Sequence, residues 1–108
     1  MVNKKIIPEL SLGGKTIRPA SPKMLVWRKY LEFYEKDKSN LTLEEFLDAH
    51  IDLIVLGFGR PEVTRETLEG CIEIADVVPT AKQLFEWLQS EVFRKLAALP
   101  NEETETAG

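Results

Sequence analysis

The sequence is poor in the two residue types that most often build reactive or metal-binding sites. Cys71 is the only cysteine, so no intramolecular disulfide can form, and a reducing cytoplasm is the simplest setting. His50 is the only histidine, which leaves too few ligands for a zinc site. The amphipathic segment around Cys71 predicts a buried, inert thiol. We therefore expect no catalytic residues, no cofactor and no metal, and a protein that is not an enzyme.

The sequence also lacks an excess of basic residues and a long hydrophobic run. Lysine and arginine number 14 against 18 aspartates and glutamates, and the net charge is −4. Binding to nucleic acid or to an anionic membrane needs a positive field, so we expect no nucleic-acid and no membrane partner. The strongly apolar run is too short for a membrane span of roughly 20 residues. Lys4 and Lys5 are not followed by the apolar stretch of a signal peptide, which predicts a cytoplasmic protein.

What the sequence contains is the core of one small helical domain. Its 108 residues are 44% hydrophobic, enough for a core without covalent staples. We predict a mainly α fold with about four helices and a short N-terminal β-hairpin. Residues 1–8 are predicted to form a flexible arm and residues 9–99 a single domain. Residues 100–108 form an acidic tail without apolar anchors and are predicted to be disordered.

The strongest signal is a central helix over residues 42–59. Thr42 followed by Glu45 has the arrangement of a capping box, and Gly59 and Pro61 mark the end. The predicted inward stripe comprises Leu43, Phe46, Leu47, His50, Ile51, Leu53, Ile54, Val55, Leu56 and Phe58. A strip predicted to face water comprises Glu44, Glu45, Asp48 and Asp52. A helix with so wide an apolar stripe must be covered on several sides.

Before it, residues 9–20 predict a hairpin turning at Gly13 and Gly14. Ser21 and Pro22 then open a helix over residues 23–38. Its aromatic face comprises Met24, Trp27, Tyr30, Leu31 and Tyr34. An isolated hairpin is marginal in water, so this one must dock on the helices or pair with another chain.

After the central helix, Thr64 is predicted to cap a shorter helix through Glu73, in which Gly70 suggests a close helix crossing. Residues 76–79 are predicted to be a connector, and Thr80 to cap a last helix that ends near Ala98. The main apolar face of that helix comprises Ala81, Leu84, Phe85, Leu88, Val92, Leu96 and Leu99.

Trp87 and Phe93 fall away from the centre of this apolar face. Two interpretations remain open for such aromatics. They are half-buried by neighbouring helices, or they belong to a surface that binds a partner.

Two further motifs bear on nucleotide and DNA binding. Gly14, Lys15 and Thr16 match the end of a phosphate-binding loop, but Glu9 stands where its first glycine is required. A helix-turn-helix over residues 42–73 is an alternative in outline. Its second helix would carry only Arg65 as a basic side chain, among several glutamates that repel phosphate.

The order of elements resembles that of tail assembly chaperones of long-tailed bacteriophages. These are small proteins encoded upstream of the tape measure protein in phages and prophages of Gram-positive bacteria. The resemblance rests on GGKTI in the hairpin, SPKMLVWRKY in the first helix, VLGFGRPEVTRETLEG after the central helix, and LAALPN. It covers residues 9–101, and the family has no catalytic signature.

The resemblance implies a chaperone that binds the tape measure protein, keeps it soluble and helps recruit the major tail protein. Such a protein works in the host cytoplasm and is absent from the mature virion. Candidate partner-binding residues are Trp27, Tyr30, Tyr34, Trp87 and Phe93. Candidate self-association residues, for a homo-oligomer, are Leu10, Leu12 and Ile17. The alternative function is that of a small helical DNA-binding or transcription-regulating phage protein.

Overall fold

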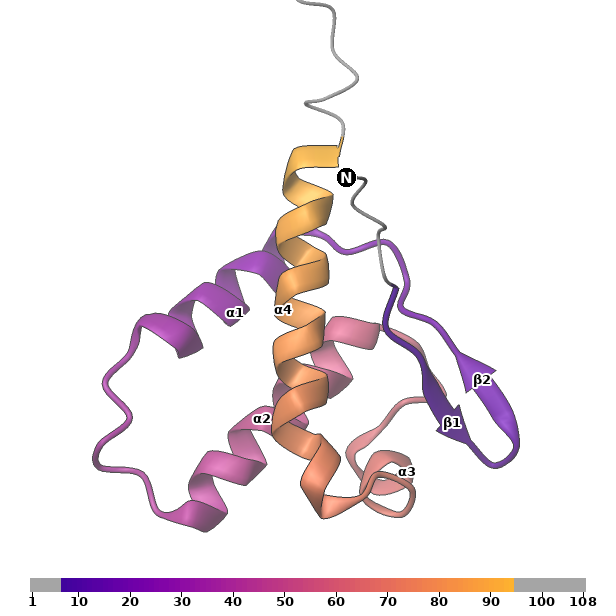
Figure 1. The fold of residues 1–108 in the computed structure, drawn as a ribbon, viewed down its shortest axis with the longest axis horizontal. Helices are drawn as coiled ribbons and strands as arrows, with labels where there is room; N and C mark the ends of the chain where they lie inside the picture. Colours follow the sequence, from indigo (N-terminus) through magenta and orange to yellow (C-terminus); the bar gives the residue numbers. More distant parts are fainter. Residues whose placement is uncertain (1–6, 95–108) are drawn as a thin grey trace, which may run out of the picture.

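The computed structural model describes residues 7–94 and confirms the predicted fold class (Figure 1). An antiparallel hairpin of β1 (Leu10–Leu12) and β2 (Lys15–Ile17) comes first. The helices that follow are α1 (Met24–Glu35), α2 (Leu43–Phe58), α3 (Arg65–Glu69), a 3-10 turn, η1 (Ile74–Asp76), and α4 (Val77–Arg94). Within the described part, no helix has the length and apolar character needed to cross a membrane.

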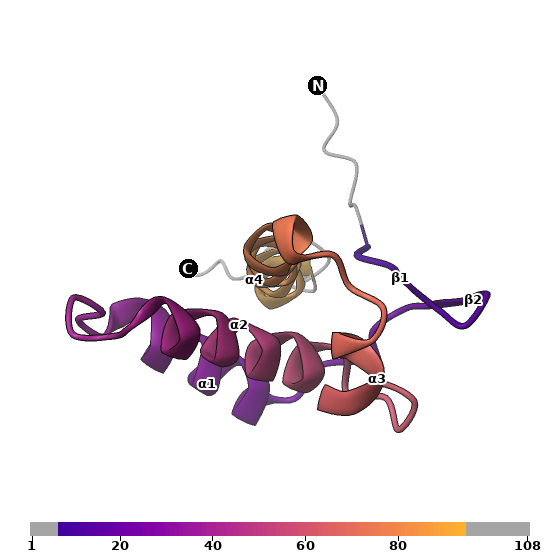
Figure 2. The ribbon, with the colours of Figure 1, turned by 90° about the horizontal axis from the view of Figure 1, so that it is seen from below.

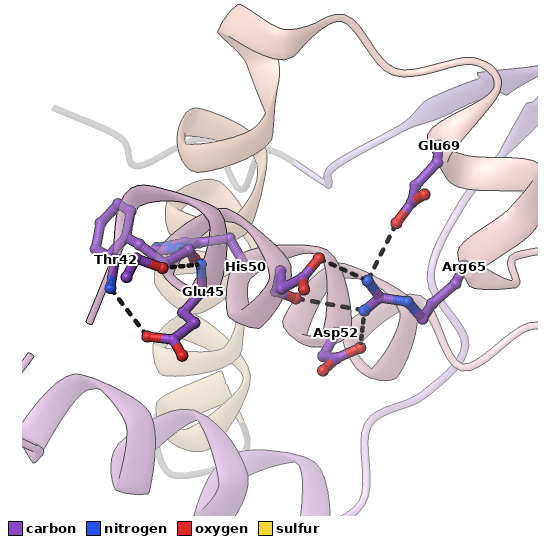
Figure 3. Close-up of polar contacts among 8 residues, drawn as sticks. Thr42, Glu45, His50, Asp52, Arg65 and Glu69 are labelled. Atoms are coloured by element: carbon purple, nitrogen blue, oxygen red, sulfur yellow. Dashed lines mark hydrogen bonds and ion pairs between the residues drawn. The ribbon is translucent and has the colours of Figure 1, made fainter.

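The central helix α2 begins and ends as predicted. The Thr42 hydroxyl accepts a hydrogen bond from the Glu45 amide at 3.1 Å, and the Glu45 carboxylate accepts one from the Thr42 amide at 2.9 Å (Figure 3). Gly59 closes the helix in the left-handed conformation, with φ of 57°. The capping box and the glycine therefore define both ends of α2.

Within residues 7–94, the three long helices form two layers, one of α1 and α2 and the other of α4 (Figure 2). Figure 2 shows α1 and α2 side by side, with α4 lying across them, and the most extensive helix interface joins α2 to α4. The largest fully buried side chains are Tyr30, Phe58, Ile54, Leu68, Leu84, His50 and Pro8. Leu43 departs from the predicted stripe, because it lies in the first turn of α2 and is 73% exposed.

Helix α1 is shorter than predicted at both ends. The cap position belongs to Lys23, which makes no side-chain capping bond, so the prediction that Ser21 and Pro22 open the helix is wrong. The helix ends at Glu35, and Lys38 folds back over its last turn. The Lys38 ammonium donates to the carbonyls of Phe33 at 3.0 Å and Tyr34 at 3.3 Å. A cation thus satisfies carbonyl groups that have no partner within the helix.

Helix α3 covers only part of the predicted span. Thr64 caps it as predicted, but the helix stops at Glu69, and Gly70 is its C-terminal cap. Among residues 7–94, no helix crosses close to Gly70, since only its own preceding turn lies near a Cβ built there. Cys71 follows the cap and is exposed, so the prediction of a buried thiol is wrong. The short helix leaves Cys71 beyond the packed face.

Helix α4 begins three residues before the predicted cap. The 3-10 turn η1 leads directly into Val77, so residues 76–79 are not a connector and Thr80 is not a cap. Pro79 is tolerated because it lies in the first turn, where amides have no partner within the helix. Leu96, Leu99, the predicted end near Ala98 and the acidic tail lie outside the described residues.

The hairpin docks on its own chain. Leu10 pairs with Ile17 across the strands, and Leu10, Leu12 and Ile17 are all buried in the single core. Pro8 is fully buried as well, so the packed chain already includes a residue that the sequence assigned to the arm. The sequence left open whether the hairpin docks on its own helices or pairs with another chain. In the structure it docks on its own helices.

Candidate functional site

Three of the predicted partner-binding residues pack inside the molecule. Trp27, Tyr30 and Tyr34 lie on one face of α1, and all three rings stack on Phe85 of α4. The centroid distances to Phe85 are 5.8 Å for Trp27, 6.0 Å for Tyr30 and 4.7 Å for Tyr34. Tyr30 is fully buried, while Trp27 and Tyr34 are half-buried. The aromatic face of α1 is therefore largely used to hold α4.

Tyr30 also joins α1 to α2 through its hydroxyl. The hydroxyl donates a 2.6 Å hydrogen bond to the Leu53 carbonyl. Burial, with a smaller contribution from Tyr34, raises the pKa of the Tyr30 phenol far above its ordinary value. The Tyr34 hydroxyl is different, because it is buried and has no hydrogen-bond partner among the described residues.

His50 is a buried residue of the core. Its Nδ1 donates to the Phe46 carbonyl at 2.8 Å, and its ring contacts those of Phe33 and Phe46. Burial is the main cause that lowers the pKa of His50, and the charges of Lys38 and Lys82 lower it further. The hydrogen bond to the Phe46 carbonyl acts in the opposite direction and raises the pKa. A neutral imidazole is therefore favoured.

Trp87 and Phe93, which the sequence left with two interpretations, have different environments. Trp87 is 7% exposed and belongs to the core, whereas Phe93 is 62% exposed on the last described turn of α4. For Trp87, the first interpretation is correct, because the rest of the fold covers its ring. Of the five predicted partner-binding residues, Phe93 offers the most open ring.

The three predicted self-association residues are not available as a surface in this fold. Beyond the strands, the hairpin is tied to the end of α2 by a hydrogen bond of 2.8 Å from the Ala20 amide to the Phe58 carbonyl. The Arg60 Nε donates to the Arg18 carbonyl at 2.9 Å. Self-association through Leu10, Leu12 and Ile17 would require the hairpin to leave its own core.

A hollow between the start of α1 and the end of α4 is the best candidate for a binding site. Its volume is about 340 Å³. The side chains that line it are those of Ser21, Pro22, Lys23, Met24, Trp27, Leu88, Glu91, Val92 and Arg94. Met24 is 59% exposed and Val92 is 45% exposed, although both occupy apolar positions of their helices. We call this hollow the α1/α4 groove.

Periodicity could not identify the α1/α4 groove. Met24 and Val92 both fit the apolar faces that the sequence assigns to the core. They are exposed because the first turn of α1 and the last described turn of α4 lie at one end of the molecule (Figure 1). Leu25 and Phe93, on these same two turns, are also exposed, as is Ile7.

Arg65 forms the main charged cluster on the α2/α3 face. Its guanidinium donates to Asp48 at 2.8 Å, to Glu69 at 3.1 Å and to Asp52 (Figure 3). The hydrogen bond with Asp52 is the largest cause that raises the pKa of Arg65. The sequence predicts that Asp48 and Asp52 only face water. In the structure both pair with Arg65, and they therefore tie α2 to α3.

The same cluster weighs against a helix-turn-helix reading of α2 and α3. Arg65 is the only basic residue of the short helix, and three carboxylates neutralise it. Helix α3 has only 5 residues, little more than one turn. A second helix whose single cation is already paired with three carboxylates has no cation left for a phosphate backbone.

No metal site accompanies these features in the described part of the chain. Among residues 7–94, no group of three or more histidine, cysteine, aspartate or glutamate side chains is placed to hold an ion. Comparisons with protein-family models, with curated proteins and with solved structures found no match.

Proposed function

We propose that this protein is a tail assembly chaperone of a long-tailed bacteriophage. It binds the tape measure protein in the host cytoplasm, keeps it soluble and helps recruit the major tail protein, without catalysis and without a cofactor. It then leaves the assembly and is not part of the virion. The sequence motifs quoted above support this proposal, and the α1/α4 groove supplies a surface for a client.

The observation that carries the proposal is the exposure of Met24 and Val92 on either side of the α1/α4 groove. An amphipathic helix binds a protein by laying its apolar face into such a groove, with anchors at helical spacing. The resemblance implies that the client is a long, aggregation-prone tape measure protein. Covering the apolar stripes of one copy keeps it from aggregating with other copies. Phe93 is a second candidate contact, because it is 62% exposed on the same turn of α4 as Val92.

The test is co-expression with the tape measure protein encoded beside this gene. The variant Met24→Ser/Val92→Ser removes the apolar sides of the groove, and Phe93→Ser tests the second candidate contact. The matched control is Leu43→Ser/Ile74→Ser, because Leu43 is 73% and Ile74 82% exposed, and neither lines the groove. Exposed positions away from packed features tolerate such changes within about 0.5 kcal/mol, so all variants should fold. Trp87 is unsuitable, since it belongs to the core.

The wild type and the control are expected to keep the client soluble and to co-purify with it. The Met24→Ser/Val92→Ser variant is expected to lose most of the co-purified client while its thermal unfolding stays close to that of the wild type. Equal client solubility with and without the wild type would overturn the chaperone function. A salt-sensitive shift of duplex DNA by the purified protein would favour the DNA-binding alternative instead.

A further inference from the structure

A second hollow continues the α1/α4 groove around the segment that precedes α1. Its volume is about 310 Å³, and it shares Ser21, Pro22, Glu91 and Arg94 with the first. Its other lining residues are Ile7, Arg18, Pro19, Arg60 and Trp87. The two hollows together form one surface, which we call the extended groove.

The charged side chains of the extended groove are mostly cationic. Four of the five are basic, namely Arg18, Lys23, Arg60 and Arg94, and the acidic one is Glu91. The whole chain has a net charge of −4, so this local excess runs against the average. We call these four residues the basic rim.

Neighbouring carboxylates neutralise only part of the basic rim. Arg18 pairs with Glu9 at 3.0 Å, and Arg94 pairs with Glu91 at 3.2 Å. Arg60 instead donates to the backbone carbonyls of Arg18 and Pro19, which are neutral acceptors. Among the ion pairs within residues 7–94, none involves Lys23 or Arg60. These two cations therefore leave a net positive charge beside the apolar side chains.

We propose that the basic rim makes the extended groove select client helices whose apolar stripe is flanked by carboxylates. This inference rests on the proposed chaperone function, and it names the chemistry of the client segment. The apolar stripe would contact Met24, Val92 and Ile7, while glutamates or aspartates beside it would face Lys23 and Arg60. Charge complementarity of this kind sets partner choice more than total affinity.

A helical protein segment fits this surface better than a nucleic acid does. Besides their cations, the hollows are lined by apolar side chains such as those of Met24, Val92 and Ile7, which a phosphate backbone does not use. Trp87 is buried and Trp27 stacks on Phe85, so neither ring is an open platform for a base. The acidic remainder of the chain also repels a polyanion that approaches from a distance.

The probes are two fluorescein-labelled helical peptides with the same leucine stripe. One carries glutamates beside the stripe and the other carries lysines at the same positions. Binding to the full chain is followed by fluorescence anisotropy at low and high salt. The test variant is Lys23→Glu, and the matched control is Lys82→Glu, which makes the same charge change on α4 but outside the extended groove.

The glutamate peptide is expected to bind the wild type about tenfold more tightly than the lysine peptide, and salt should reduce the difference. Lys23→Glu should abolish or reverse this preference, while Lys82→Glu should retain it. Equal binding of both peptides to the wild type, or a preference that Lys23→Glu leaves intact, would overturn the selectivity. Competition by single-stranded or duplex DNA, together with weak binding of both peptides, would assign the basic rim to nucleic acid and overturn it as well.

The two proposals can fail separately. If the peptides show the expected preference but the tape measure protein is not kept soluble, the extended groove serves another acidic client and the proposed function is wrong. If the client is kept soluble through Met24 and Val92 but the peptides bind equally, the chaperone function stands and the basic rim has no part in selection.

Discussion

The Tyr30 hydroxyl lies 2.6 Å from the Leu53 carbonyl and would lie equally close, 2.6 Å, to a Cβ atom built on Gly57. A glycine one turn after Leu53 thus leaves the space that the phenol occupies. Leu84 of α4 approaches the same point, with its Cδ1 3.1 Å from that Cβ position. Helices α1, α2 and α4 meet at Gly57, and the aromatic face of α1 is positioned by this contact.

Tyr30→Phe is expected to destabilise the protein, whereas Tyr34→Phe is not. The first change removes a buried hydrogen bond and should lower the free energy of unfolding by about 1 to 2 kcal/mol. The second removes a buried hydroxyl that has no partner among the described residues, and should be neutral or slightly stabilising. Urea denaturation of both variants measures the difference. Equal losses would show that the Tyr30 hydrogen bond does not contribute as the geometry implies.

Gly57→Ala is expected to destabilise the protein although alanine is the better helix former. Alanine gains up to about 1 kcal/mol of helix propensity, but the added methyl group meets Tyr30 Oη and Leu84, and such overpacking typically costs about 1 to 3 kcal/mol. The double variant Gly57→Ala/Tyr30→Phe removes one of the two obstructing atoms. Its loss should be smaller than the sum of the single losses in a thermal-unfolding cycle. Simple additivity would argue against a shared contact.

Arg65→Met is expected to lower stability modestly and to do so less at high salt. The Arg65 side chain is 42% exposed, so solvent screens each pair, and the whole cluster contributes on the order of 1 kcal/mol. Lys29→Met is the control, because the carboxylate that Lys29 reaches within residues 7–94 is that of Glu32 on the same helix, at 3.9 Å. Chemical denaturation with urea at two salt concentrations measures both. A loss that salt leaves unchanged would point to packing by the Arg65 stem instead.

Stability is expected to fall below about pH 6.5 through His50. Because burial lowers the pKa of His50 in the folded state, the unfolded chain takes up the proton first as the pH falls. This contribution is complete above the ordinary histidine pKa and declines as the pH drops toward the lowered one, by at most about 1.4 kcal/mol per pH unit. Lys38 and Lys82 oppose protonation further.

His50→Phe keeps a ring among Phe33, Tyr34 and Phe46 and removes the titrating group. The difference in unfolding free energy between this variant and the wild type should therefore depend on pH between 7.5 and 5.5, in the direction given above. Urea midpoints at several pH values measure it. A difference that stays constant over this range would mean that His50 does not titrate differently in the folded state.

Patterns within single segments account for much of the fold. The two ends of α2 were predictable because Thr42, Glu45 and Gly59 act on neighbouring backbone groups. The hairpin turn was predictable because two consecutive glycines tolerate positive φ, and Gly13 and Gly14 both adopt it. The start of α4 was not, since Pro79 marks a boundary in most sequences but is tolerated in a first turn. A capping residue helps only where the chain makes a bond with it, and Ser21 and Thr80 do not act as caps.

The candidate site was less accessible to sequence reasoning. Of the predicted aromatics, Phe93 remains open, whereas Tyr30 and Trp87 are covered by other helices. The α1/α4 groove uses Met24 and Val92, which have the periodicity of core residues. Lys23 and Arg60 are distant in sequence and share one surface only through the packing of the segments around Pro22.

The sequence by itself determined the helical class, the hairpin, both ends of α2 and the absence of an intramolecular disulfide. These follow from one cysteine, from local hydrogen bonds and from the period of apolar residues, all of which act over a few positions. The tertiary structure alone decided which apolar residues are covered, where α4 begins, and that Arg65 joins Asp48 and Asp52. Those outcomes depend on which segments meet, because burial and ion pairing are set by distances between residues far apart in the chain.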